Sequence, residues 1–237
     1  MNQDRRPGSQ IPLPLALKEK PGLDQFIVGE NQEAIHTLRN TARGIAHSNL
    51  FIWGQHGCGI SHLLQAACLL ADSAGRKLSY IPLASIPDIE PQILENLEQL
   101  DLVFIDDIDR ATDLPDWEQA LFNLYNRTRE SGSLLVIGSH TRPQALPFSL
   151  QDLKSRMSWD LVYRISPLGD ADKIEALQRR ARSRGFQLPS EVAGFIVNRV
   201  NRDMPSLMNC LDVLENESLV EQRKLTIPFV RRLLGLG

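Results

Sequence analysis

The sequence contains few cysteines, and none of them lies close to another. Cys58, Cys68 and Cys210 are odd in number and far apart, and the 237 residues contain no CxxC pair. This spacing argues against a disulfide framework and against a zinc site, and it is typical of proteins from a reducing compartment. We therefore expect a cytoplasmic protein with no structural metal.

Long apolar runs and a strong excess of one charge are also missing. No apolar stretch approaches the roughly 20 residues of a membrane span, and the polar N-terminus contains no signal-peptide core. The formal net charge is −3, so the overall charge does not favour nucleic-acid binding. The 42% of hydrophobic residues can nevertheless bury a core. These features predict a soluble intracellular protein that does not contact membranes.

Apolar strands alternate with amphipathic helices up to residue 166. We predict strands at 49–53, 77–83, 101–109 and 134–139, a last strand before Pro167, and helices at 31–47, 61–75, 90–99 and 114–132. The first helix has one apolar face, made by Ala34, Ile35, Leu38, Ala42 and Ile45. This alternation predicts an α/β three-layer sandwich around a parallel sheet.

Residues 167–237 carry a different pattern. Only helical periodicity remains there, at 170–184, 189–200, 204–221 and 226–234. We therefore expect a small all-helical lid subdomain beside an α/β core at 23–166. Residues 1–22 contain several prolines and glycines and are predicted to form an extended, mobile leader.

A glycine-rich segment, WGQHGCGISHLL (53–64), lies between a predicted strand and a predicted helix. In this position backbone N–H groups and the helix N-terminus can hold phosphate oxygens. The segment departs from the P-loop pattern at Ile60, which replaces the phosphate-binding lysine before Ser61. Loss of that charge should weaken nucleotide binding and favour a diphosphate over a triphosphate. The alternative is a glycine-rich turn that binds no ligand.

The run LVFIDD (102–107) is predicted as a strand that ends in Asp106 and Asp107. Ligands of open α/β sheets bind at the carboxyl edge where such a strand ends, and an aspartate there can hold magnesium beside the P-loop serine. Taken alone, the acidic pair is equally typical of a helix cap or a turn. Its place after the glycine-rich loop in a βαβ series favours the P-loop class.

One single arginine and one arginine cluster each have more than one possible role. Arg156 lies on a predicted short helix before the last core strand, where an arginine usually pairs with a surface carboxylate. The predicted lid contains a cluster consisting of Arg179, Arg180, Arg182 and Arg184. This cluster suits either nucleic-acid phosphates or a solvated helix face with counter-charges, and no interleaved aromatic residues indicate base stacking.

The predicted leader contains the peptide QIPLPL (10–15), in which apolar residues are spaced by prolines. Such a pre-extended segment can dock into a hydrophobic groove at a low cost in conformational entropy. Exposed apolar side chains in a leader favour a docking site for them. The alternative is a flexible leader that binds nothing.

Together these motifs resemble a known family. The segments FIVGENQEA (26–34), the glycine-rich loop, FIDDID (104–109), LKSRMSW (153–159) and QRKLTIPFVRRLLG (222–235) are similar to the AAA+ core of the bacterial replication initiator DnaA. With the leader peptide, the chain is similar to the Hda family of DnaA-related regulators, which inactivate the initiator after replication begins. The resemblance spans nearly the whole chain and implies an AAA+ P-loop NTPase-like fold.

The resemblance also implies roles for individual residues. The nucleotide-binding positions would be Val28, Gly29, Gly54, Gly57, Cys58, Gly59, Ile60, Ser61 and His62. Magnesium, present only with a nucleotide, would be held by Ser61, Asp106 and Asp107. Arg156 would be an arginine finger offered in trans to the nucleotide bound by DnaA. The β sliding clamp would bind the leader through Gln10, Leu13 and Leu15.

The chain departs from the family pattern where a triphosphate would be handled. Besides Ile60 in the loop, His140 aligns with the sensor-1 acid and Pro205 aligns with the sensor-2 arginine. The finger residue is kept. We therefore predict a negative regulator of replication initiation, without autonomous activity, that binds the clamp and stimulates ATP hydrolysis by ATP-bound DnaA.

Two other functions remain alternatives: an autonomous weak ATPase of the helicase-loader kind, and a non-catalytic scaffold between the clamp and DnaA. The expected nucleotide is ADP, with weak or absent binding as the other outcome. DNA contact is expected mainly through the clamp, at the replisome on the nucleoid. A homodimer is also compatible with the sequence.

Overall fold

The structure is a computed structural model that describes residues 22–23, 26–221 and 225–235. Side chains are described within these ranges except at 218–221. The proposed clamp-binding residues Gln10, Leu13 and Leu15 lie outside the described residues. No helix in the described ranges has the length and apolar character needed to span a membrane.

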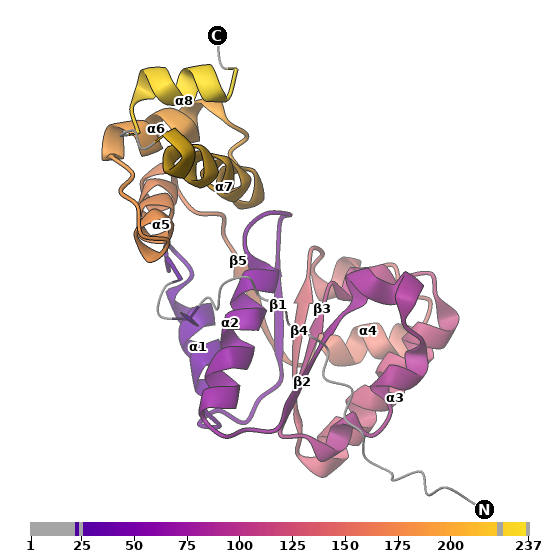
Figure 1. The fold of residues 1–237 in the computed structure, drawn as a ribbon. Coiled ribbons are helices and arrows are strands. Elements are labelled where there is room, and N and C mark those ends of the chain that lie inside the picture. Colours follow the sequence, from indigo (N-terminus) through magenta and orange to yellow (C-terminus); the bar gives the residue numbers. More distant parts are fainter. Residues whose placement is uncertain (1–21, 24–25, 222–224, 236–237) are drawn as a thin grey trace, which may run out of the picture.

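The described chain folds around one sheet of five parallel strands (Figure 1). The strands are β1 (Leu50–Gly54), β2 (Leu78–Pro82), β3 (Leu102–Asp106), β4 (Leu134–Ser139) and β5 (Leu161–Ile165). Their order across the sheet is β2-β3-β4-β1-β5, so the first strand lies between the last two. In this register Leu50 lies opposite Val136 on one side and Leu161 on the other.

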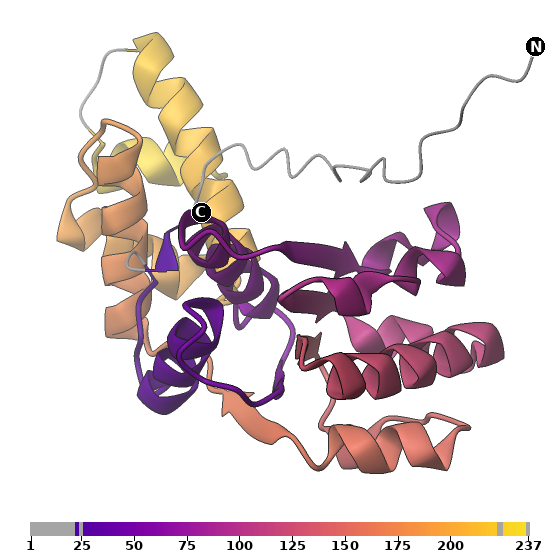
Figure 2. The same ribbon diagram turned by 90° about the horizontal axis from the view of Figure 1, so that it is seen from below.

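Helices cover both faces of the sheet, which confirms the predicted three-layer α/β sandwich (Figures 1 and 2). One face carries α1 (Gln32–Ala42) and α2 (Ile60–Ser73), and the other carries α3 (Pro115–Ser131) and α4 (Gln151–Met157). Side chains alternate along each strand, so Leu102 and Phe104 pack under α1 and α2 while Val103 and Ile105 pack under α3 and α4. The strands are therefore apolar on both faces, as parallel sheets require.

The lid is built from α5 (Asp170–Ser183), α6 (Ser190–Arg199), α7 (Met204–Glu221) and α8 (Ile227–Leu233). It has its own apolar cluster, which includes Leu177, Val192, Leu211 and Val230. Figure 1 shows the lid above the ends of α1 and α2. The connection from β5 to α5 carries the chain out of the sheet and into the lid.

Two predicted helices differ from the structure. The helix predicted at 31–47 ends at Ala42, because Gly44 adopts a left-handed conformation with φ 76°. The placement of Ile45 on its buried face was wrong, since 63% of that residue is exposed.

The helix predicted at 90–99 consists of two short 3-10 turns, η3 (Pro91–Leu94) and η4 (Leu97–Gln99), which are separated by the left-handed Asn96. Packing of Leu94 and Leu97 against the α3 side of the core favours these turns.

Three other connections contain short 3-10 turns. They are η2 (Leu83–Asp88), η5 (Ile108–Ala111) and η6 (Pro143–Ala145). The turn η5 follows β3 directly, so the strand predicted at 101–109 ends three residues early, at Asp106. This early end places Asp107 and Asp109 on a turn instead of on the strand.

Replacing Phe104 tests the assignment of the core on the α2 side of the sheet. Phe104 is fully buried, and Phe104→Ala should lower the free energy of unfolding by about 3–5 kcal/mol through lost burial and a cavity. Chemical denaturation followed by fluorescence measures this change. The control Ile45→Ala removes a mostly exposed side chain and should change stability by no more than about 0.5 kcal/mol. Equal effects of the two substitutions would contradict this assignment of the core.

Candidate functional site

The glycine-rich loop joins the end of β1 to the first turn of α2. Gly57 and Gly59 have φ values of 78° and 96°, which non-glycine residues rarely adopt. A Cβ atom at Gly54 would lie 2.7 Å from both the Cys58 sulfur and the Ile165 carbonyl oxygen. Glycine at these positions therefore lets the backbone turn tightly at the N-terminus of α2, where peptide N–H groups attract anions.

Ile60 begins α2 and is buried in the core. It belongs to the same apolar cluster as Leu63 and Leu64. A Cβ atom at Gly138 on β4 would lie only 2.9 Å from the Cγ2 atom of Ile60. The residue in the P-loop lysine position thus packs inward against the sheet and brings no positive charge to the loop.

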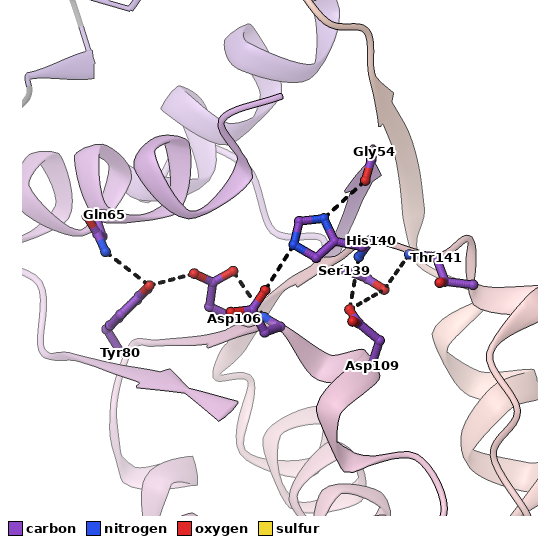
Figure 3. Close-up of polar contacts among 9 residues, drawn as sticks. Gly54, Gln65, Tyr80, Asp106, Asp109, Ser139, His140 and Thr141 are labelled. Carbon is purple, nitrogen blue, oxygen red and sulfur yellow. Dashed lines mark hydrogen bonds and ion pairs between the residues drawn. The ribbon is translucent and has the colours of Figure 1, made fainter. Parts of the chain in front are cut away.

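Asp106 ends β3 and is only 2% exposed. Its Oδ2 atom accepts a hydrogen bond of 2.6 Å from the Tyr80 hydroxyl on β2, and its Oδ1 atom accepts one of 3.1 Å from the Asp107 N–H group (Figure 3). The Gln65 amide in turn donates to the Tyr80 oxygen at 3.3 Å. Burial, followed by the negative charge of Asp106, raises the pKa of Tyr80, so this hydroxyl keeps its proton and remains a donor.

Asp107 points toward a histidine on the neighbouring strand end. Its Oδ1 atom lies 3.2 Å from Nε2 of His140, and the other ring nitrogen of His140 lies 3.3 Å from the Gly54 carbonyl oxygen (Figure 3). Asp107 has a left-handed backbone conformation with φ 55°, which is uncommon for a non-glycine residue. The His56 ring packs on His140 with 3.7 Å between the ring centroids.

The surroundings of Asp107 raise the pKa of its carboxyl group. Burial and then the neighbouring charge of Asp106 raise the pKa of Asp107, while His140 lowers it. Asp109, on η5, accepts hydrogen bonds from the Ser139 hydroxyl at 3.2 Å and from the His140 N–H group at 2.9 Å. The ends of β1, β3 and β4 are therefore joined by one polar network at the carboxyl edge of the sheet.

A cavity of about 780 Å³ lies between the loop and the lid. The core contributes its loop residues together with Phe26, Ile27, Asp107, Arg110 and His140, and the lid contributes Arg179, Arg180, Arg182, Met204, Pro205 and Met208. Gly57 lies close to the lid, because a Cβ atom there would be 3.0 Å from Cβ of Asp203 and 3.4 Å from Cδ of Pro205. The cavity therefore has walls from both parts of the molecule.

The lid arginines do not share one environment. Arg179 pairs with Glu175 one turn earlier on α5, and Arg182 donates to the Gln178 carbonyl oxygen. Arg184 instead pairs with Asp212 and Glu215 on α7, away from the cavity wall. The sequence analysis assigned this cluster to a solvated helix face or to nucleic-acid phosphates, whereas three of its members line the same cavity as the glycine-rich loop. Their helical spacing with Ala176 and Ser183 is the signal that was missed.

Most of the predicted nucleotide-binding residues line the cavity, and a few lie elsewhere. Gly57, Cys58, Gly59, Ile60, Ser61 and His62 are in its wall, as are Asp107, His140 and Pro205. Val28, Gly29 and Gly54 are not in the wall, and Phe26 and Ile27 are found in it instead. Val28 packs against the core cluster. A Cβ atom at Gly29 would lie 3.2 Å from Leu168, at the start of the lid connection.

His62 lies at the boundary between the loop and the lid. Its ring stacks on Phe26 with centroids 5.9 Å apart. Burial and then the positive charge of Arg180 lower the pKa of His62. The ring therefore stays neutral at neutral pH and leaves the positive charge of this wall to the arginines.

Arg156 lies in the last turn of α4, on the far side of the sheet from α2 (Figure 1). It is half-buried, and its guanidinium carbon lies 4.6 Å from the centroid of the Phe122 ring. No carboxylate of the described residues forms an ion pair with it. Arg156 does not line the cavity of its own chain.

The strand order, the loop after β1, the acidic end of β3 and the helical lid together define an AAA+ protein. The family model of the bacterial DnaA ATPase domain matches residues 17–164, and that of the Hda lid domain matches residues 170–234. The first match covers more than half of the sequence, so the chain belongs to the bacterial DnaA ATPase-domain family. Its lid is of the Hda type.

Solved structures show the same fold. Domain III of the Thermotoga maritima replication initiation protein DnaA matches with a TM-score of 0.79 and 22% identity, over 90% of this chain and 95% of that one. The replication initiator DnaA bound to AMPPCP and single-stranded DNA matches with a TM-score of 0.70 and 20% identity, over 85% and 68%. The Thermotoga maritima RuvB Holliday junction branch migration motor matches with a TM-score of 0.70 and 17% identity, over 92% and 72%.

The contact between Tyr80 and Asp106 can be tested by its effect on stability. Tyr80→Phe removes one donor to a buried carboxylate and should lower the free energy of unfolding by about 1–3 kcal/mol. Tyr163→Phe is the matched control, because the Tyr163 hydroxyl contacts the half-buried Thr37 at 3.1 Å and the exposed Glu33 at 3.3 Å. Chemical denaturation should show a smaller loss for the control. Equal losses would show that Asp106 does not depend on Tyr80.

Proposed function

We propose that this chain inactivates the replication initiator DnaA by stimulating hydrolysis of the ATP that DnaA holds. The observation that carries the proposal is the position of Arg156, on a helix outside the chain's own cavity and without a carboxylate partner among the described residues. The product would be ADP-bound, inactive initiator. Membership of the DnaA family supports a paired arrangement of two related subunits.

The helix that carries Arg156 is held to α3 at both ends. The Glu118 carboxylate, which is 2% exposed, accepts a hydrogen bond of 2.8 Å from the Leu150 N–H group before α4. The Tyr125 hydroxyl oxygen lies 3.1 Å from the Arg156 carbonyl oxygen and 2.8 Å from Asp160. These contacts fix the backbone under the arginine, and Phe122 supports its guanidinium face.

The proposed chemistry needs only positive charge delivered at the correct place. Negative charge spreads over the transferred phosphoryl group during ATP hydrolysis, and an arginine supplied by a partner neutralises it. Arg156 would do this for the γ-phosphate held by DnaA. The chain's own cavity would hold ADP, which would set the orientation of core and lid and would not be hydrolysed.

An exposed aromatic residue supports a partner surface next to Arg156. Trp159 follows α4 and is 65% exposed, with the Arg129 guanidinium 5.7 Å from its ring centroid. Large aromatic side chains at the surface are enriched where proteins bind one another. Trp159 would pack against DnaA while Arg156 reaches the nucleotide.

The leader peptide would bring the chain to replicating DNA. Gln10, Leu13 and Leu15 are proposed to bind the β sliding clamp, as the resemblance implies. Tethering to a clamp on DNA raises the local concentration of the regulator near DnaA. DNA would then be contacted through the clamp.

Replacing Arg156 tests the finger. Arg156→Ala should reduce the stimulation of ADP formation by ATP-bound DnaA by about 10³-fold or more, or to the basal rate of DnaA if that is reached first. Radiolabelled ATP on DnaA, mixed with clamp-loaded DNA and the regulator, measures this directly. Arg164→Ala is the control, because Arg164 also lies over an aromatic ring, at 5.4 Å from Trp53. Full stimulation by Arg156→Ala would favour a scaffold, and ATP turnover by the chain alone would favour an autonomous ATPase.

Replacing the leader glutamine tests the tether separately. Gln10→Ala should weaken binding to the isolated clamp by about tenfold or more, since truncating an interface anchor commonly costs over 1 kcal/mol. Gln3→Ala lies in the same leader, outside the QIPLPL peptide, and should leave the affinity unchanged. Surface plasmon resonance with immobilised clamp gives both values. Equal affinities would exclude the peptide as the clamp-binding element.

A further inference from the structure

We propose that the cavity binds a nucleoside diphosphate without magnesium, because His140 engages the carboxylate that would face the metal and lid arginines supply the positive charge. The inference rests on the proposed function only in taking the cavity as a nucleotide site. Four observations carry it: the burial and hydrogen bonds of Asp106, the contacts of His140, the charge of the cavity wall and the burial of Ile60.

The carboxylate at the end of β3 is already satisfied by donors from the protein. Both oxygens of Asp106 accept hydrogen bonds, from Tyr80 and from the Asp107 N–H group, and the residue is 2% exposed. In P-loop proteins an aspartate at this place and the loop serine hold the metal. Because Asp106 is buried and each of its oxygens already accepts a hydrogen bond, a magnesium ion that keeps several of its waters has little access to it.

His140 contacts both the end of β3 and the end of β1, where the glycine-rich loop begins. A metal beside a bound nucleotide would lie between these two elements. One ring nitrogen faces Asp107 after β3, and the other faces the Gly54 carbonyl oxygen at the start of the loop. The distances are 3.2 Å to the Asp107 carboxylate and 3.3 Å to the carbonyl oxygen, so the ring fills the space between the two elements. The His56 ring packs on the same imidazole. Asp107 therefore has a partner in the chain itself.

Arginines predominate among the charged residues that are described in the cavity wall. They are Arg110, Arg179, Arg180 and Arg182, and the described wall contains one carboxylate, that of Asp107. Glu175 pairs with Arg179 from outside the wall. Guanidinium groups bind phosphate oxygens with two hydrogen bonds at once. This charge suits a diphosphate, and the arginines would replace both the missing lysine and the metal.

Calorimetric titration with ADP, with magnesium chloride in one buffer and EDTA in the other, tests the proposal on the full-length protein. The dissociation constant in EDTA should be no higher than the one in magnesium, because the metal adds no contact to the protein and only competes for ADP in solution. Manganese is the direct probe of the metal, and its electron paramagnetic resonance spectrum with protein and ADP should match that of manganese and ADP alone. Tenfold weaker binding in EDTA, or manganese held by the protein, would overturn the proposal.

Single substitutions distinguish the contribution of the arginines to ADP binding from that of His140. Arg180→Gln should weaken ADP binding by about tenfold or more in both buffers, since a hydrogen bond to a charged group contributes about 1.5–3 kcal/mol. Arg199→Gln is the matched control, because Arg199 is an exposed lid arginine outside the cavity wall, and it should bind as the parent does. Equal affinities for the two variants would overturn the role of Arg180.

His140→Ala releases Asp107 and should make ADP binding depend on magnesium, with at least about threefold tighter binding in the magnesium buffer. A variant that stays independent of magnesium would overturn the role of the histidine. Absence of ADP binding in every buffer would also overturn the inference. The proposed function is tested separately, by the stimulation of ATP hydrolysis on DnaA, and the outcome of the ADP titrations does not decide it.

Discussion

The hydrogen bonds that end on the aspartates at the carboxyl edge of the sheet support the rest of the site. Asp106 joins β3 to β2 through Tyr80, Asp107 joins β3 to the loop after β1 through His140, and Asp109 joins η5 to the end of β4. A buried carboxylate is stable only when donors surround it. The position of the glycine-rich loop, and so the floor of the cavity, follows from these contacts.

The arginines with proposed roles lie at two separate places in the molecule. Arginines of α5 and η5 face the cavity between core and lid, whereas Arg156 lies beyond the sheet on α4. Because the sheet and its helices stand between the two places, one arginine group cannot substitute for the other. This separation supports the proposal that the chain would hold its own nucleotide without hydrolysing it and act on the nucleotide of a neighbour.

The cavity also couples the two parts of the molecule. Its walls come from the loop on one side and from α5 and α7 on the other, and Gly57 lies against Asp203 and Pro205 at the start of α7. A ligand that contacts both walls favours the arrangement of core and lid in which both contacts are made. The proposed nucleotide would therefore position the lid relative to the core.

The sequence by itself determined the alternation of strands and helices, the helical lid and the glycine-rich loop, because these follow from the local spacing of apolar residues and glycines. It also located Arg156 on a short helix before the last strand. Only the tertiary structure decided that Arg180 faces the cavity and that His140 lies between Gly54 and Asp107. These contacts join residues far apart in the chain, so they depend on how strands and lid pack, which local periodicity does not encode.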